Sequence, residues 1–261
     1  MTPKENHPET IINSASCNII RADNFDRGIA RKLILPGEIT GIKTFFAELR
    51  GGIANKYLPE HEQLRILVFT DGSGHIVQDG FNVAIEELSL FVPDLNWEFM
   101  ITSDEKSLSY LEIMLQLTAE DISCLNERED NFPFFVRYSE CGQYDENIKS
   151  AKTVSRIILP EDIVPRLCIG SVQTTGPDEV GTHAHPMLEQ LFFGLSGNDI
   201  MVMADSAKTR FLEKELLHIP LGSRHGTKVE TGKVLHYIWI DLFHSMEDMD
   251  YITDSHILKD E

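Results

Sequence analysis

Residues 181–189 read Gly-Thr-His-Ala-His-Pro-Met-Leu-Glu, and residues 220–225 read Pro-Leu-Gly-Ser-Arg-His. These two segments contain four candidate metal ligands: His183, His185, Glu189 and His225. Residues two apart in an extended strand point to the same side, so the first two histidines share a face, and the glutamate four residues on keeps that parity. The last histidine follows a Pro-x-Gly turn, from which a returning strand would carry it back to the others. Three neutral nitrogen donors and one carboxylate suit a divalent first-row metal, with positions left for water or substrate.

The chain around these segments is an internal duplication. Three blocks recur at an offset of 124 or 127 residues: 31–39 with 155–163, 58–64 with 185–191, and 90–93 with 217–220. A shared register over separate blocks indicates a repeated unit. The duplication divides the chain into a first barrel, a linker with a short helix, a second barrel that holds the metal site, and an acidic tail, at residues 20–118, 119–149, 150–245 and 246–261.

Each half has the pattern of a small all-β domain. Short β-branched and aromatic runs alternate with Gly, Asp and Pro roughly every 8–12 residues, and long helical periodicity is missing. Such a pattern predicts a small sandwich or barrel in each half.

The two histidine-containing segments resemble the motifs of the cupin superfamily. Its first motif has His-x-His followed three or four residues later by Glu, and its second has Pro-x-Gly followed after two residues by His. His183, His185, Glu189 and His225 occupy the metal-ligand positions of these motifs. With the duplication, the chain resembles a bicupin. The resemblance implies two tandem double-stranded β-helix (jelly-roll) barrels, with one divalent ion of iron, manganese, nickel or zinc at the mouth of the second.

The first half is expected to hold no metal. The offset of 127 places Lys56, Leu58, Glu62 and Glu98 at the ligand positions, and a cation with an aliphatic side chain cannot complete a metal site. Lys56, Glu62 and Glu98 would instead form a polar cluster, most simply a structural ion pair. His61 is expected to point to the opposite face. The first barrel would then pack against the second and stabilise it.

Other side chains are weaker candidates for the site. Arg224 adjoins a ligand histidine and could contact an anionic substrate, and Glu189, if weakly bound to the metal, could act as a base. Arg166 is a candidate substrate contact on an early strand. Tyr237 and Trp239 alternate with Asp241 on one strand face, which lines either the pocket or the partner sheet. Strand parity also suggests an apolar lining from Leu191, Phe193 and Ile238 or Trp239.

Charge and composition limit the partners of the protein. The 261 residues include 23 Lys and Arg against 42 Asp and Glu, a net charge of −19, which disfavours nucleic acid and anionic membranes as partners. No apolar run approaches the ~20 residues of a membrane helix, and the first residues lack a secretory pattern. The four cysteines form no Cys-x-x-Cys pair. We therefore expect a cytoplasmic protein with a small-molecule partner, either a monomer or a homodimer.

Two classes of function remain open. The chain is either an enzyme acting on a sugar, uronate or carboxylate as an isomerase, lyase or dioxygenase, or a non-catalytic bicupin that binds or senses a small ligand or metal. The discriminating feature is a proton-transfer group in the pocket beyond the four ligands.

Overall fold

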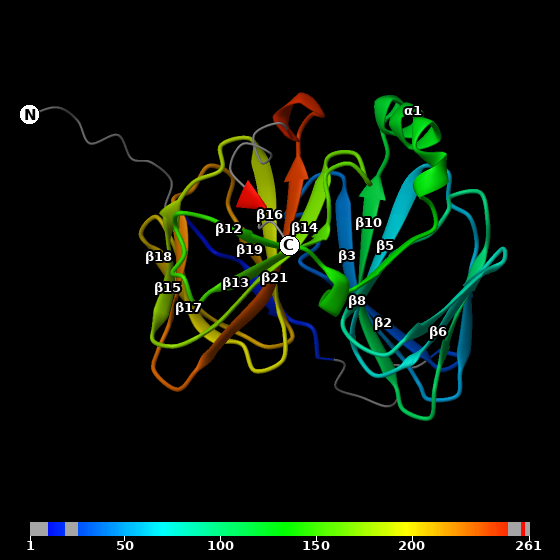
Figure 1. The fold of residues 1–261 in the computed structure, drawn as a ribbon, viewed down its shortest axis with the longest axis horizontal. Helices are drawn as coiled ribbons and strands as arrows, with labels where there is room; N and C mark the ends of the chain where they lie inside the picture. The colour runs from blue at the N-terminus through cyan, green and yellow to red at the C-terminus, as the bar shows by residue number, and fades with distance from the viewer. Residues whose placement is uncertain (1–9, 19–25, 250–256, 259–261) are drawn as a thin grey trace, which may run out of the picture.

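The computed structural model describes residues 10–18, 26–249 and 257–258. Nearly all regular structure is β, arranged in two bodies that lie side by side (Figure 1). Each body combines one large and one small antiparallel sheet, so the all-β prediction is confirmed.

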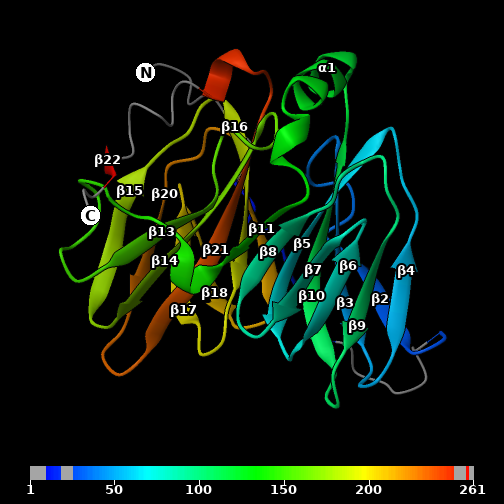
Figure 2. The same cartoon turned by 45° about the vertical axis from the view of Figure 1, so that its right-hand side comes forward.

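The first body contains a six-stranded and a four-stranded sheet. The order of the large sheet is β11 (Phe134–Arg137), β8 (Ser89–Val92), β5 (Gln63–Asp71), β10 (Leu108–Gln116), β3 (Ile42–Leu49) and β2 (Ile29–Ile34). The small sheet, in view in Figure 2, runs β4 (Ala54–Tyr57), β9 (Phe99–Ser103), β6 (Gly74–Gln78) and β7 (Phe81–Ile85).

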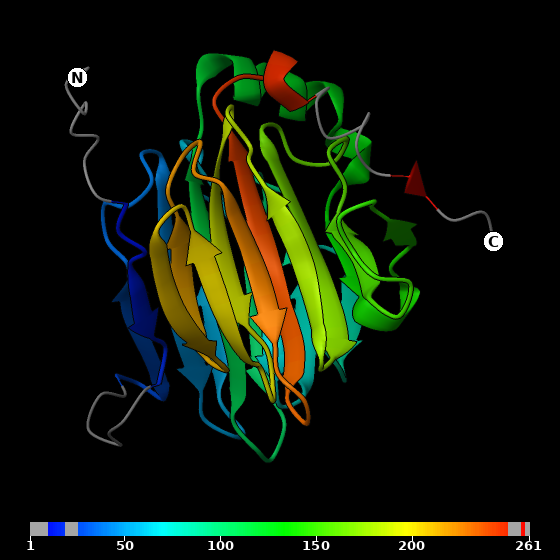
Figure 3. The same ribbon diagram turned by 90° about the vertical axis from the view of Figure 1, so that its left-hand side faces the viewer.

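The second body, which faces the viewer in Figure 3, repeats this arrangement. Its large sheet has the order β1 (Ser14–Ser16), β19 (Glu215–Ile219), β16 (Leu188–Gly194), β21 (Val234–Phe243), β14 (Leu167–Thr175), β13 (Val154–Leu159), β12 (Gln143–Asp145) and β22 (Ile257–Leu258). Its small sheet runs β15 (Asp178–His183), β20 (His225–Val229), β17 (Asp199–Ala204) and β18 (Ala207–Leu212). The order β8-β5-β10-β3-β2 thus recurs as β19-β16-β21-β14-β13, which is the duplication seen in the sequence.

The two barrels exchange edge strands. Strand β1 precedes the first barrel in the chain but pairs with β19 of the second. Strand β11 precedes the second barrel but pairs with β8 of the first. Each large sheet is therefore extended by a segment that lies next to the other barrel in the sequence.

The connecting segment at 119–149 does more than join the barrels. It begins with the expected short helix, α1 (Ala119–Glu127), whose N-terminus is closed by a reciprocal capping box between Thr118 and Asp121. It also contributes strands β11 and β12 to the two large sheets. Short 3-10 turns occupy Glu129–Asn131, Tyr138–Glu140 and Glu247–Met249. Within the described parts of the chain, no helix is long and apolar enough to cross a membrane.

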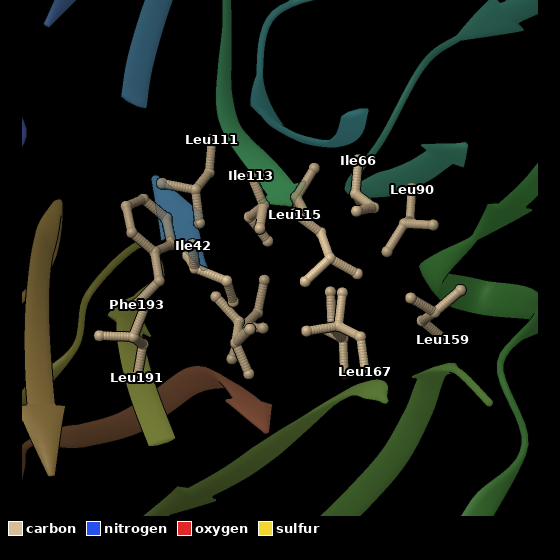
Figure 4. Close-up of a cluster of buried hydrophobic side chains, with 14 of the residues drawn as sticks. Ile42, Ile66, Leu90, Leu111, Ile113, Leu115, Leu159, Leu167, Leu191 and Phe193 are labelled. Atoms are coloured by element: carbon tan, nitrogen blue, oxygen red, sulfur yellow. The ribbon is translucent and has the colours of Figure 1, made fainter. Parts of the chain in front are cut away.

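The largest apolar core lies between the barrels rather than inside either one. Residues of both large sheets interdigitate there (Figure 4), and the rings of Phe46 and Phe193 stack with centroids 6.1 Å apart. Leu191, Phe193 and Ile238 belong to this core, so the prediction that they line the pocket is wrong. Phe192 and Trp239 face the interior of the second barrel instead.

Candidate metal centre

Three histidines meet at the mouth of the second barrel. His183 ends β15 and pairs directly with His225, the first residue of β20. His185 lies in the connection between β15 and β16. One ring nitrogen from each lies within 4.8 Å of the others, and the ring centroids are 4.4 to 5.5 Å apart.

Backbone carbonyls fix the orientation of two of these rings. His183 Nδ1 lies 2.8 Å from Gly181 O, and His225 Nδ1 lies 3.2 Å from Ser223 O. A carbonyl only accepts, so each Nδ1 carries the proton and each Nε2 keeps its lone pair. His225 Nε2 is buried and has no hydrogen-bond partner among the described residues. This arrangement is typical of metal-binding histidines.

Burial keeps the two rings neutral. It lowers the pKa of His183, and it lowers the pKa of His225 to about 3 together with the neighbouring His183 ring. Neutral imidazoles are the form that binds a metal, and three of them at this spacing suit a divalent first-row ion. The residues therefore fit the metal that the sequence motif implies.

The structure does not bring Glu189 into this group. Its Oε2 lies 3.2 Å from His218 Nε2, and His218 Nδ1 lies 3.0 Å from Glu38 Oε2. The reason is the non-strand connection at 184–187, which breaks the alternation that would have aligned Glu189 with the histidines. The next residue, Gln190, faces the cavity in its place.

Gln190 is held firmly at this position. Its Nε2 donates to Asp241 Oδ1 at 2.7 Å, and its buried Oε1 has no hydrogen-bond partner within the described residues. Burial raises the pKa of Asp241 to about 8 in spite of this hydrogen bond. Gln190 also stands at the longer spacing that the cupin motif allows for its acidic ligand.

A small cavity of about 30 Å³ opens beside the histidines. That is room for about one water molecule. Beyond the histidines, the lining combines apolar and tyrosine side chains with two carboxyl groups, those of Glu146 and Asp241, and the amine of Lys149. The cavity is small, and its lining carries both acidic and basic side chains.

Lys149 and Glu146 form a buried ion pair in this lining. Their side chains are 7% and 14% exposed. Lys149 Nζ also lies 2.9 Å from Ser155 Oγ and 3.2 Å from Tyr144 Oη, and burial lowers its pKa. Both charges act on the pKa of His183, Glu146 raising it and Lys149 lowering it. The sequence patterns did not identify Glu146 and Lys149, because both residues lie in the predicted linker, outside the repeat and outside any motif.

Of the remaining candidates, two line the cavity and two lie outside it. Tyr237 and Trp239 line the cavity, and Trp239 Nε1 donates to Tyr144 Oη at 3.2 Å. Arg224 is exposed, and its Nη2 reaches only Thr182 O at 3.5 Å, outside the lining. Arg166 also lies outside, where its guanidinium holds both oxygens of Asp121 at 2.9 and 2.6 Å. Arg166 thus ties helix α1 to the second barrel.

The corresponding positions of the first barrel carry an ion pair. Lys56 Nζ lies 2.6 Å from Glu98 Oε1, and both side chains are more than half exposed. Leu58 and Glu62 are exposed as well, and Glu62 does not take part in this pair.

Solved structures of similar fold cover most of the chain. An oxalate decarboxylase from Lactobacillus farciminis, solved as a formate complex, matches with a TM-score of 0.67 at 13% identity, over 90% of this chain and 87% of that one. A variant of the Bacillus subtilis oxalate decarboxylase matches with a TM-score of 0.67 at 14% identity, over 93% of this chain and 80% of that one. The fold is that of the cupins. AerE from Microcystis aeruginosa matches this cupin fold with a TM-score of 0.63 at 8% identity, over 84% of this chain and 94% of that one. No protein-family model and no curated protein matches the sequence.

Proposed function

We propose that the chain is a metal-dependent cupin enzyme that acts on a small carboxylate as a lyase. One divalent ion of iron, manganese, nickel or zinc would be held by the three histidines, His183, His185 and His225. The amide oxygen of Gln190, rather than Glu189, would lie at the fourth position. The observation that carries the proposal is the buried pair of Lys149 and Glu146, which gives the cavity proton-transfer groups beyond the metal ligands.

The size and charge of the cavity favour a small anionic substrate. A space of about 30 Å³ is smaller than any of these substrates, so the lining would have to move for each of them, and for a sugar or uronate more than for a small carboxylate. Lys149 presents a cation at the same lining, where a low local dielectric strengthens its attraction for a carboxylate. Two of the similar folds are oxalate decarboxylases by name, which agrees with this substrate class.

Each group has a defined task in the proposed reaction. A metal bound by the histidines would supply a Lewis acid that polarises a substrate oxygen. Lys149 would neutralise the substrate carboxylate and hold a proton at Nζ, and Glu146 would keep that ammonium in place. Tyr237 and Trp239 would exclude water from the cavity and fix the orientation of the substrate.

The test separates metal binding from turnover. Metal content and carbon dioxide release would be measured with oxalate and other small carboxylates for the wild type, Lys149→Gln and His183→Ala. We expect Lys149→Gln to keep about one metal per chain and lose turnover by about 10²–10⁴-fold, as expected for a general acid. His183→Ala should lose the metal. A metal-loaded Lys149→Gln with wild-type turnover would refute the role of Lys149.

The small cavity also supports a second candidate, a cupin that binds metal without catalysis. A metal-loaded wild type that binds one ion tightly but turns over no carboxylate, sugar or uronate would favour this alternative. Loss of that ion in His225→Ala would still confirm the site.

A further inference from the structure

The first barrel has a much larger cavity at the corresponding place. Its volume is about 450 Å³, which lies within the range of sites for small organic ligands. Five of its lining positions correspond, at the offset of 127, to lining positions of the second barrel: Phe45 to Val172, Gln63 to Gln190, Arg65 to Phe192, Glu112 to Trp239 and Met114 to Asp241. The two cavities therefore share part of their lining positions and differ in their chemistry.

The chemistry of this cavity is cationic. Its lining carries Arg31, Lys43 and Arg65 against Glu60 and Glu112. A net positive pocket stands out in a chain of net charge −19, because most of the surface repels anions.

A buried carboxylate holds the two arginines in position. The Glu112 side chain is 0% exposed, and its oxygens lie 2.5 Å from Arg31 Nε and 3.0 Å from Arg65 Nε. The Arg31 guanidinium also lies 3.3 Å above the centre of the Phe45 ring, and that of Arg65 lies 4.4 Å from the centre of Tyr57. The order of these cations is thus fixed before any ligand arrives, which lowers the entropic cost of binding.

Two cationic groups remain available to a ligand. Among the residues that the structure describes, neither Lys43 Nζ nor the terminal nitrogens of Arg31 have a hydrogen-bond or ion-pair partner. Both side chains are exposed at the cavity mouth. Arg65, 11% exposed, lies deeper, and its guanidinium is already paired with Glu60 and Glu112.

We infer that the first barrel binds a small organic carboxylate in this cavity, through Arg31 and Lys43 and without a metal. A planar guanidinium matches a planar carboxylate with two parallel hydrogen bonds. The apolar lining from Ile29, Phe45 and Met114 suits the carbon skeleton of such a ligand better than a bare inorganic ion. The site does not depend on the proposed activity of the second barrel.

The test uses the full chain with His183→Ala and His225→Ala, so that the second barrel cannot contribute a metal-bound carboxylate. Succinate binding is followed by calorimetry at constant ionic strength, with inorganic phosphate as the comparison. We expect one succinate per chain, and a loss of affinity of about tenfold or more in Arg31→Gln and in Lys43→Gln, since a hydrogen bond to a charged group is removed. Lys106→Gln, an exposed change of the same charge outside the lining, should bind as the parent does.

The outcome decides the inference in either direction. Partial recovery in Arg31→Lys, which restores charge without the planar fork, would support the geometry. Absence of succinate binding at about 10 mM would overturn the site, because a complex with a dissociation constant of about 1 mM would be nearly saturated at that concentration. Equal affinity in Arg31→Gln and Lys43→Gln, or tighter binding of phosphate than of succinate, would overturn it as well. A thermal melt of each variant shows that the compared proteins are folded.

Discussion

Adjacent residues 189 and 190 offer a sharp test of the metal centre. Glu189→Gln changes a side chain that contacts His218, whereas Gln190→Leu removes an amide that faces the histidines. Loss of a group that supports a metal site typically costs about 10–100-fold in affinity. We expect that loss in Gln190→Leu and none in Glu189→Gln, where the amide oxygen can still accept from His218 Nε2.

The corresponding change in stability follows from binding linkage. At a metal concentration about 100 times the dissociation constant, binding stabilises the wild type by ~2.7 kcal/mol. A 10-fold weaker site leaves ~1.4 kcal/mol and a 100-fold weaker one ~0.4 kcal/mol. With about 2–4 °C per kcal/mol for a chain of this size, the metal-dependent rise in Tm falls from ~5–11 °C to a few degrees or less.

The assay is a pair of thermal melts for each variant, one with a chelator and one with added metal. Reading the difference between the two melts cancels any change in intrinsic stability. The reasoning is refuted if Glu189→Gln loses the metal-dependent rise while Gln190→Leu keeps it, because that pattern would place the carboxylate at the metal.

Three further predictions concern the barrels and their connections. Phe193→Ala should lower the free energy of unfolding by about 3–5 kcal/mol in urea titration, because it leaves a cavity between the large sheets. An effect below 1 kcal/mol would show that the neighbouring side chains move in and fill this cavity. Arg166→Ala should cost about 3 kcal/mol near pH 7, since it leaves the buried Asp121 carboxylate without its partner. Burial alone would raise the pKa of Asp121, but hydrogen bonds from Arg166 and Thr118 outweigh it and hold that pKa below its usual range. The pair therefore stabilises the fold above the ordinary carboxyl pKa and loses this effect as the pH falls through the lowered value. The difference between wild type and Arg166→Ala should shrink in acid, and a difference that is constant down to about pH 2 would contradict this account. Deletion of residues 10–16 should lower the Tm of the second barrel and expose the edge of β19. The exposed edge would be detected by sedimentation as concentration-dependent association. An unchanged Tm and an unchanged monomer–dimer balance would show that β1 is dispensable.

The sequence predicted the repeat, the all-β class and the approach of three histidines to one another. Each of these depends on local spacing or on self-similarity. The prediction failed where strand parity was extended across a break. The connection at 184–187 separates the histidines from β16, so residue 190 rather than residue 189 faces the cavity. Parity within β16 was also uninformative, since both of its faces are buried and the pattern does not tell the barrel interior from the contact with the other barrel.

The cavity residues that come from the connecting segment could not be predicted from the sequence, for a different reason. Glu146 and Lys149 have no counterpart in the repeat, and a lysine near acidic residues in a predicted linker is normally solvated surface. The pairing of β12 with β13 and the bridge between Lys149 and Val180 of β15 carry this segment along the second barrel and place the two charges at the cavity.

The pairing of the exchanged edge strands determines when each barrel can be completed during synthesis. Among the described strands, β1 is the first to be synthesised, yet its partner β19 begins at Glu215, about 200 residues later. At roughly 5–20 residues per second, β1 waits about 10–40 s for that partner. Strand β11, in contrast, emerges soon after β8 and can complete the first barrel while the second is still being translated. The nascent chain thus carries a completed first barrel together with an unpaired β1 segment, which finds its partner only when β19 of the second barrel has been made.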